Sequence, residues 1–164
     1  MLEGSGILIF DPENKTKKHA LQSSWKTVAL IQTDCDIHAY YSWFIEKRYN
    51  LKLNQPLRGS HVTILSDMIG RDSINENPIE IYEKVKKEFE GKVMNFKYDP
   101  NVRTNGEHWW LKVTCEEAEN FRERIGLKRD PYWGFHLTLG LPNNKTIEHS
   151  YYIWGLIKKG FIKT

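Results

Sequence analysis

The sequence predicts a single α+β domain made of two pseudo-symmetric lobes, each combining antiparallel strands with helices. The chain has 164 residues, a length that suits one domain and can bury a sufficient core without disulfides or metal. The predicted order strand, helix, strand occurs twice, over residues 25–65 and 108–139. The second strand of each copy carries the same short polar pattern. We therefore expect residues 1–164 to fold as one unit around a central cleft, with residues 1–24 as an N-terminal arm.

Apolar periodicity predicts the strands and the helix in the first half of the chain. Residues 25–33 are rich in β-branched and apolar side chains and are expected to form a strand. A helix should run from about 36 to 49, where apolar residues recur at helical spacing. The strand at 58–65 carries the first polar pattern. The arm of residues 1–24 starts with a short apolar run and continues as a basic loop, so it either packs on the domain or is partly mobile.

The second half is marked by caps and turns. Asn77 and Pro78 are typical of a helix start, and Gly91 is typical of a helix end. Asn105-Gly106 is a hairpin turn signal between two strands, and residues 114–117 have the form of a capping box that opens a helix ending at Gly126. The expected strands are 92–98, 108–114 and 132–139. A last helix is expected over 146–159, although its Tyr, Ile and Trp residues would also suit a strand.

The polar pattern consists of a His and a Thr two residues apart, framed by apolar residues. It occurs as Ser60-His61-Val62-Thr63-Ile64-Leu65 and as Phe135-His136-Leu137-Thr138-Leu139. In a strand, residues i and i+2 point to the same face, so each His shares a face with its Thr while the apolar residues point to the core.

Two such strands side by side would place two imidazoles and two hydroxyls around one small volume. One imidazole can take a proton from an attacking hydroxyl, the other can protonate the leaving oxygen, and the hydroxyls can hold phosphate oxygens. The candidate catalytic residues are therefore His61, Thr63, His136 and Thr138. The simpler alternative is a pair of half-buried histidines that bond to the backbone, beside ordinary strand threonines.

Composition narrows the classes of ligand. The formal net charge is +3, which does not suggest duplex DNA binding by a broad basic face but suits a small anion in a local positive pocket. The six His and two Cys show no metal-ligand spacing, so we expect neither metal nor cofactor. Cys35 and Cys115 are expected to be free thiols. No apolar run could span a membrane and no secretory leader is recognised, which favours a cytoplasmic protein.

The paired His-x-Thr motifs resemble the 2H phosphoesterase superfamily over roughly residues 25–158. This resemblance implies a metal-independent enzyme that uses His61 and His136 as acid and base. Within the superfamily, the chain is similar to small phage phosphodiesterases that defeat the bacterial CBASS immune system by cleaving cyclic di- and trinucleotides. The motif forms H-V-T-I and H-L-T-L are similar, as is a Glu followed six residues on by Trp (Glu148 and Trp154). The resemblance implies that this pair contacts the base, and it places the enzyme in the host bacterial cytoplasm.

Two alternatives remain open beside this interpretation. One is an RNA-end enzyme similar to 2′,3′-cyclic phosphodiesterases and 2′-5′ RNA ligases, and the other is a module that binds a cyclic nucleotide without cutting it. Further candidate contacts are Tyr132, which alternation places on the His136 face, Tyr151 on the C-terminal segment, and Lys26 on the first strand. Arg58 is expected on the opposite face from His61 unless a bulge at Gly59 intervenes. The C-terminal aromatic segment would also allow a homo-oligomer in which it completes a neighbour's site.

Overall fold

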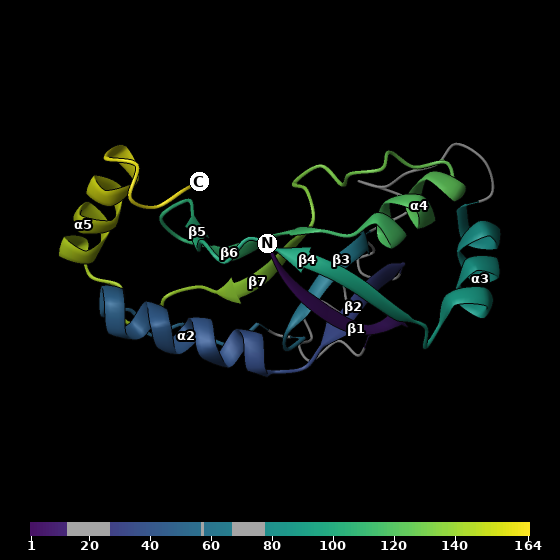
Figure 1. Ribbon diagram of the computed structural model, residues 1–164, viewed down its shortest axis with the longest axis horizontal. Coiled ribbons are helices and arrows are strands. Elements are labelled where there is room, and N and C mark those ends of the chain that lie inside the picture. Colours follow the sequence, from purple (N-terminus) through teal and green to yellow (C-terminus); the bar gives the residue numbers. More distant parts are fainter. Residues whose placement is uncertain (13–26, 57, 67–77) are drawn as a thin grey trace.

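The computed structural model describes residues 1–12, 27–56, 58–66 and 78–164. These residues form an α+β fold with seven strands and four helices (Figure 1). In chain order the elements are β1 (Leu2–Phe10), β2 (Val28–Thr33), α2 (Asp36–Tyr49), β3 (His61–Ser66), α3 (Pro78–Phe89), β4 (Val93–Tyr98), β5 (Arg103–Thr104), β6 (Trp109–Thr114), α4 (Glu116–Arg124), β7 (His136–Gly140) and α5 (Ile147–Lys158).

The strands form one sheet in the order β4-β1-β2-β3-β7-β6-β5, and every pairing in it is antiparallel. An additional pairing links β4, the first strand in this order, to β6, the last but one. Residues 2–10 belong to the predicted N-terminal arm, and they form β1, which lies between β2 and β4. Residues 13–24 of that arm lie outside the described residues.

One face of the sheet carries the main core. The alternation predicted for the patterned strands is observed, because Val62, Ile64, Leu137 and Leu139 are fully buried. On β6, Trp109 is buried and Trp110 is half-buried, so only one of the two faces the core. Residues of α2, α3 and α4 join the same cluster, among them Tyr41, Ile45, Tyr82, Ala118 and Phe121. The helices therefore cover the face opposite to the His-x-Thr side chains.

Most predicted helix boundaries are confirmed, with one correction at α4. The predicted cap of that helix, Thr114, is the last residue of β6, and the N-cap is Cys115. The Cys115 Sγ accepts a hydrogen bond from the backbone N–H of Ala118 at 3.4 Å. The alternative of a C-terminal strand is wrong, because α5 is helical and begins with Thr146 in a capping box with His149. Cys35 and Cys115 are both free thiols, as expected.

The starts of the two patterned strands also differ from the prediction. The sequence pattern predicts strands that start at residues 58 and 132, but they begin at His61 and His136. The reason is a turn just before each strand, in which Gly59 and Gly134 have φ angles of +68° and +67°. Such a left-handed conformation interrupts the extended backbone and is readily adopted by glycine. The consequence is that strict alternation cannot be extended back to Arg58 or Tyr132.

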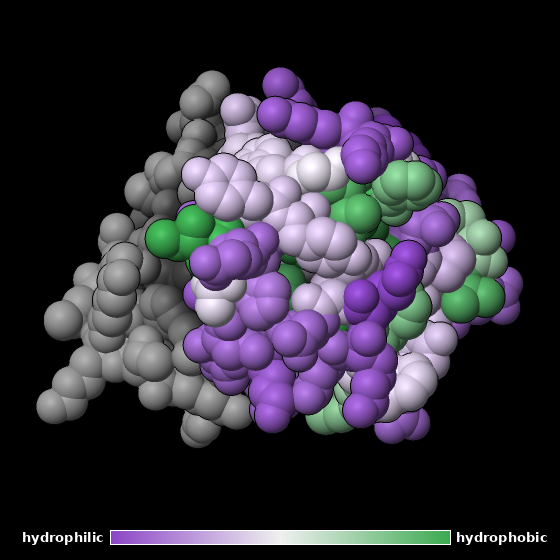
Figure 2. Space-filling view, turned by 90° about the vertical axis from the view of Figure 1, so that its left-hand side faces the viewer, coloured by the Kyte–Doolittle hydropathy of each residue, from purple (hydrophilic) through white to green (hydrophobic). Residues whose placement is uncertain are grey.

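Different helices lie at the two ends of the molecule. Helix α5 lies at one end of the long axis, and α3 and α4 lie at the other (Figure 1). The surface around the α5 end is largely hydrophilic, with smaller hydrophobic patches (Figure 2). Among the described helices, none is long and apolar enough to cross a lipid bilayer.

Candidate active site

The two His-x-Thr motifs meet where β3 pairs with β7. Val62 is the register partner of Leu137 in this antiparallel pair. One residue to either side, the same register brings His61 across from Thr138 and His136 across from Thr63. All four side chains are half-buried, on the face opposite to the main core. The local arrangement is thus symmetric, with each histidine lying across from the other motif's threonine.

Both imidazoles are held by the same backbone device. The His61 Nδ1 lies 2.9 Å from the carbonyl oxygen of Gly59, and the His136 Nδ1 lies 3.0 Å from that of Gly134. Each glycine closes a tight turn, in which its N–H donates to the carbonyl of a proline three residues earlier, Pro56 at 2.9 Å and Pro131 at 2.8 Å. The sequence contains the whole device twice, as P-x-x-G-x-H-x-T at 56–63 and 131–138. This longer repeat is the signal by which the glycines could have been found.

The Nδ1 contact determines what each ring can do. A carbonyl oxygen only accepts hydrogen bonds, so Nδ1 of each ring carries the proton that is donated to it. In the neutral ring, Nε2 then has the free lone pair and can accept a proton, and in the charged ring Nε2–H can donate one. Both rings are therefore oriented for acid–base work through Nε2. A mere half-buried histidine would not require the same turn at both motifs.

The surroundings favour the neutral form of both rings. Burial lowers the pKa of His61 below its ordinary value of 6.5, and the positive charges of Arg58 and His136 lower it further. Burial likewise lowers the pKa of His136, with a smaller contribution from His108. The hydrogen bonds to Gly59 and Gly134 act in the opposite direction. A bound anion would supply the negative charge that stabilises an imidazolium at this site.

Arg58 lies closer to the site than simple alternation predicted. It belongs to the turn that ends at Gly59, and its side chain is largely buried. Burial lowers the pKa of its own guanidinium, and its charge is one of the causes that lower the pKa of His61. The turn, which takes the place of a bulge at Gly59, therefore gives Arg58 an electrostatic influence on the first imidazole.

Neighbouring strands add side chains that the sequence-based site did not include. Gln32 on β2 is the register partner of His61, and its Nε2 donates to the Ser60 carbonyl at 2.7 Å. On β6, Trp110 is the partner of Thr138 and Lys112 is the partner of His136. Directly paired residues point to the same face of a sheet. Only the strand register reveals these neighbours.

The other predicted contact residues are not brought to the histidines by any observed interaction. Tyr132 is exposed in the turn before β7, where its ring packs edge-on against Trp133. Glu148, Tyr151 and Trp154 are exposed on α5, and the Trp154 indole lies against Gly106, whose turn precedes β6. Lys26 lies outside the described residues. Among the described residues, no group of three or more His, Cys, Asp or Glu could hold a metal ion.

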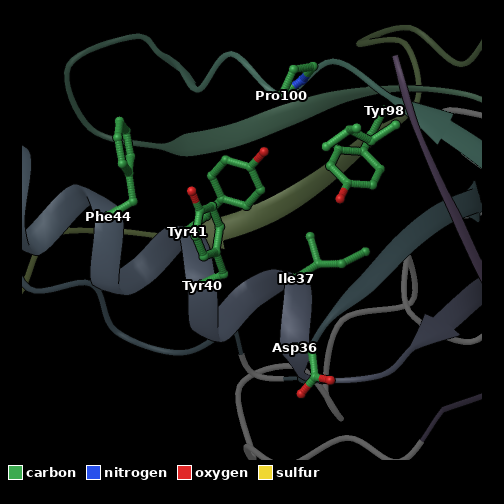
Figure 3. Close-up of a pocket in the computed structure, with 8 residues that line it drawn as sticks. Asp36, Ile37, Tyr40, Tyr41, Phe44, Tyr98 and Pro100 are labelled. Atoms are coloured by element: carbon green, nitrogen blue, oxygen red, sulfur yellow. The ribbon is translucent and has the colours of Figure 1, made fainter.

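A pocket of about 450 Å³ lies elsewhere, between α2 and the end of β4 (Figure 3). Tyr40, Tyr41 and Phe44 of α2 line it, facing Tyr98 and Pro100. Burial raises the pKa of Tyr41 to about 12, so its hydroxyl stays neutral. None of the four motif residues lines this pocket. The chemistry that the motifs can perform therefore belongs to the face of the sheet where β3 and β7 pair.

An antiparallel α+β domain that aligns two His-x-Thr motifs across one strand pair defines a class of two-histidine phosphoesterases. Residues 29–146 match the family described as 2H-SAK, the Swiss Army Knife 2H phosphoesterase domain, and the chain belongs to this family. The expected superfamily is thereby confirmed. The matched region contains both motifs and ends before α5. No match was found among curated proteins or among solved structures.

Proposed function

We propose that this protein is a metal-independent phosphodiesterase that cleaves 3′-5′ bonds of cyclic di- and trinucleotide immune signals. The observation that carries the chemistry is the pair of imidazoles, each fixed through Nδ1 and each lying across the strand pair from a threonine of the other motif. Family membership supports phosphodiester hydrolysis in general. The cyclic substrate and the anti-CBASS role rest on the sequence resemblance, as do the two lobes and a cleft between them.

The proposed reaction has two steps. In the first, a neutral imidazole takes the proton of the 2′-hydroxyl through Nε2, and the oxygen attacks the adjacent phosphorus. The bond to the 5′-oxygen breaks, and the opposite imidazolium protonates that leaving oxygen. The product is a 2′,3′-cyclic phosphate. In the second step water attacks, the two rings exchange roles, and a 3′-phosphate results. Thr63 and Thr138 donate to the non-bridging oxygens throughout.

We assign the base of the first step to His61 and the acid to His136. The two imidazoles disfavour a second proton on each other equally, whereas the positive charge of Arg58 disfavours a proton on His61. On the other side, His108 and Lys112 are exposed, so solvent screens their charges. The charge of the largely buried Arg58 is screened less. When a single proton is shared between the two rings, this difference favours its residence on His136. The first attack is then activated on the β3 side of the strand pair.

An RNA-end enzyme is the second candidate function. Opening a 2′,3′-cyclic phosphate is the second step of the same reaction, so the same four residues would perform it. The extent of the family match favours keeping this candidate, because residues 29–146 contain both motifs but not Glu148 and Trp154, the pair on which the cyclic substrate rests. A module that binds without cutting is the third, and it would have no use for two oriented Nε2 atoms.

The deciding experiment incubates the protein, in EDTA, with a panel of nucleotides and identifies products by mass spectrometry. The panel contains cyclic dinucleotides with 3′-5′ and 2′-5′ linkages, a cyclic trinucleotide, and a linear RNA with a 2′,3′-cyclic phosphate end. Linear 3′-phosphate products from the cyclic signals are expected. Opening of the RNA end alone would transfer the assignment to RNA processing, and tight binding without product would indicate a sequestering module. Loss of activity in EDTA alone would contradict the metal-independent mechanism.

Histidine variants provide the controls. His61→Ala and His136→Ala should remove turnover, and His149→Ala, at the start of α5, should retain it. Turnover that survives both motif variants would identify a contaminating nuclease or a different site.

A further inference from the structure

The strand register places eight side chains in two rows across β2, β3, β7 and β6. One row consists of Gln32, His61, Thr138 and Trp110, and the other consists of Leu30, Thr63, His136 and Lys112. Neighbouring strands lie about 4.8 Å apart, so each side chain has its row neighbours one strand spacing away. The four motif residues occupy the centre of this array, with one flank on β2 and the other on β6.

The two flanks differ in chemistry. On β2, Leu30 is buried, and Gln32 already donates its side-chain amide to the backbone of Ser60. On β6, Trp110 is half-buried and Lys112 is exposed. Within the described part of the chain, no ring contact is observed for Trp110 and no ion pair for Lys112. The β6 flank therefore offers an aromatic face and a positive charge, whereas the β2 flank offers neither.

Trp110 is placed away from the core by its own strand. Trp109, Leu111 and Val113 are buried and alternate with Trp110 and Lys112, which point to the motif face. The pairing of Trp110 with Thr138 comes directly after an irregularity in the β6–β7 register. As a result, an indole lies one strand spacing from a hydroxyl that would hold a phosphate oxygen.

We propose that Trp110 is the stacking platform for the nucleobase next to the scissile phosphate, and that Lys112 holds a phosphate oxygen beside His136. This inference rests on the proposed function and deepens it, because it makes the substrate a nucleotide that is oriented toward β6. An indole stacks on any base, so Trp110 supplies affinity for nucleobases in general. A phosphodiester without a base would lose this contact and keep the others.

The test compares two substrates that differ only in the base, adenosine 2′,3′-cyclic phosphate and ribose 2′,3′-cyclic phosphate. Trp110→Ala should raise KM for the adenosine compound roughly 5- to 100-fold, as loss of one base-stacking contact does. KM for the ribose compound should change little, and Trp110→Phe should recover most of the loss. Trp43→Ala, which removes an exposed tryptophan of α2, is the matched control. Equal effects of Trp110→Ala on both substrates would overturn the proposal.

A binding measurement separates this inference from the proposed catalysis. Adenosine 2′,3′-cyclic phosphate is titrated by calorimetry into His136→Ala, with and without Trp110→Ala. Weaker binding on removal of the indole supports the platform even if the wild-type protein cleaves nothing. Equal affinity, or no binding to either variant, overturns it.

Lys112 is tested in the same way. Lys112→Gln should raise KM for both substrates and reduce the dependence of KM on salt, because an ionic contact to phosphate is lost. Lys84→Gln, on the exposed side of α3, should change neither property. An unchanged salt dependence in Lys112→Gln would remove Lys112 from the site.

Discussion

The turn at Gly134 offers the sharpest test of how the imidazoles are oriented. The perturbation is Gly134→Ala. A β-carbon at this position would meet no atom within 4 Å, so the substitution causes no clash. Its cost comes from the φ angle of +67°, which an L-residue adopts at a penalty of roughly 1–2 kcal/mol. The free energy of unfolding should therefore fall by about that amount, and the protein should still fold.

The backbone strain that Gly134→Ala introduces is similar in size to the free energy of the hydrogen bond that holds the His136 ring. A net hydrogen bond contributes about 0.5–1.5 kcal/mol, so relief of the strain can compete with the bond from His136 Nδ1 to the Gly134 carbonyl. When the carbonyl turns away, the ring loses its fixed orientation. A displacement of about 1 Å at a reacting group can cost on the order of 10²-fold in rate. We expect kcat/KM to fall roughly 10- to 100-fold.

Gly91→Ala is the matched control. Gly91 follows α3, has a φ angle of +79°, and also leaves room for a β-carbon. The two variants should lose similar stability in urea denaturation, but only Gly134→Ala should lose activity. Nitrogen-15 NMR of the histidine side chains should show that the Nδ1–H form of His136 is depleted in that variant alone. Equal activity of Gly134→Ala and Gly91→Ala would refute the argument that the carbonyl orients the ring.

Three further predictions concern the histidines and the support of β3. His61→Ala and His136→Ala should each lower kcat by ~10²–10⁴-fold while ligand affinity changes little in calorimetry; a near wild-type rate in either variant would contradict the two-histidine mechanism. Because the pKa of both rings lies below 6.5 in the free protein, the form with one neutral and one charged ring is most populated below that pH. The pH profile of kcat/KM should thus peak below about 6.5, and that of kcat should peak higher because the bound anion stabilises the imidazolium; a kcat/KM maximum above pH 7.5 would oppose this. Arg122→Met removes a buried guanidinium that donates to the carbonyls of Ile64 and Lys128 at 2.8 Å, and should lower the free energy of unfolding by about 3 kcal/mol in urea. The exposed Arg129→Met should lower it far less, because solvent screens its ion pairs, and similar losses in both would show that the buried bonds contribute little.

Local sequence patterns predict those helices and strands whose formation depends mainly on neighbouring residues. The helix α2, the start of α3 at Pro78 and the strands β4 and β6 agree with predictions from apolar spacing or turn residues, whereas the predicted cap Asn77 lies outside the described residues. The position of β1 could not be predicted in this way. Its place between β2 and β4 depends on partners far away in the sequence, and residues 2–6 carry little of the alternation that marks a strand.

At the candidate site, too, the sequence predicts what is local to one strand and no more. Alternation predicted which face His61 and Thr63 share, because that face depends only on the strand itself. Alternation does not hold across Gly59 and Gly134, because a turn with a positive φ angle resets the direction of the following side chains. The repeated proline and glycine before each motif carry this information in the sequence. They become meaningful once the carbonyl of each glycine is seen to hold its histidine.

The partners of the motif residues across the sheet depend on register, which a single strand does not encode. The resemblance implies that Trp154, downstream of the second motif, contacts the base, and the Trp154 indole lies against the turn at Gly106. The register instead places Trp110 beside Thr138. The flanks on β2 and β6 also differ in chemistry, because only β6 places a lysine and an indole beside the motif residues. A symmetric pair of motifs thus lies in an asymmetric array, and this asymmetry provides a physical reason for a nucleotide to bind in one direction.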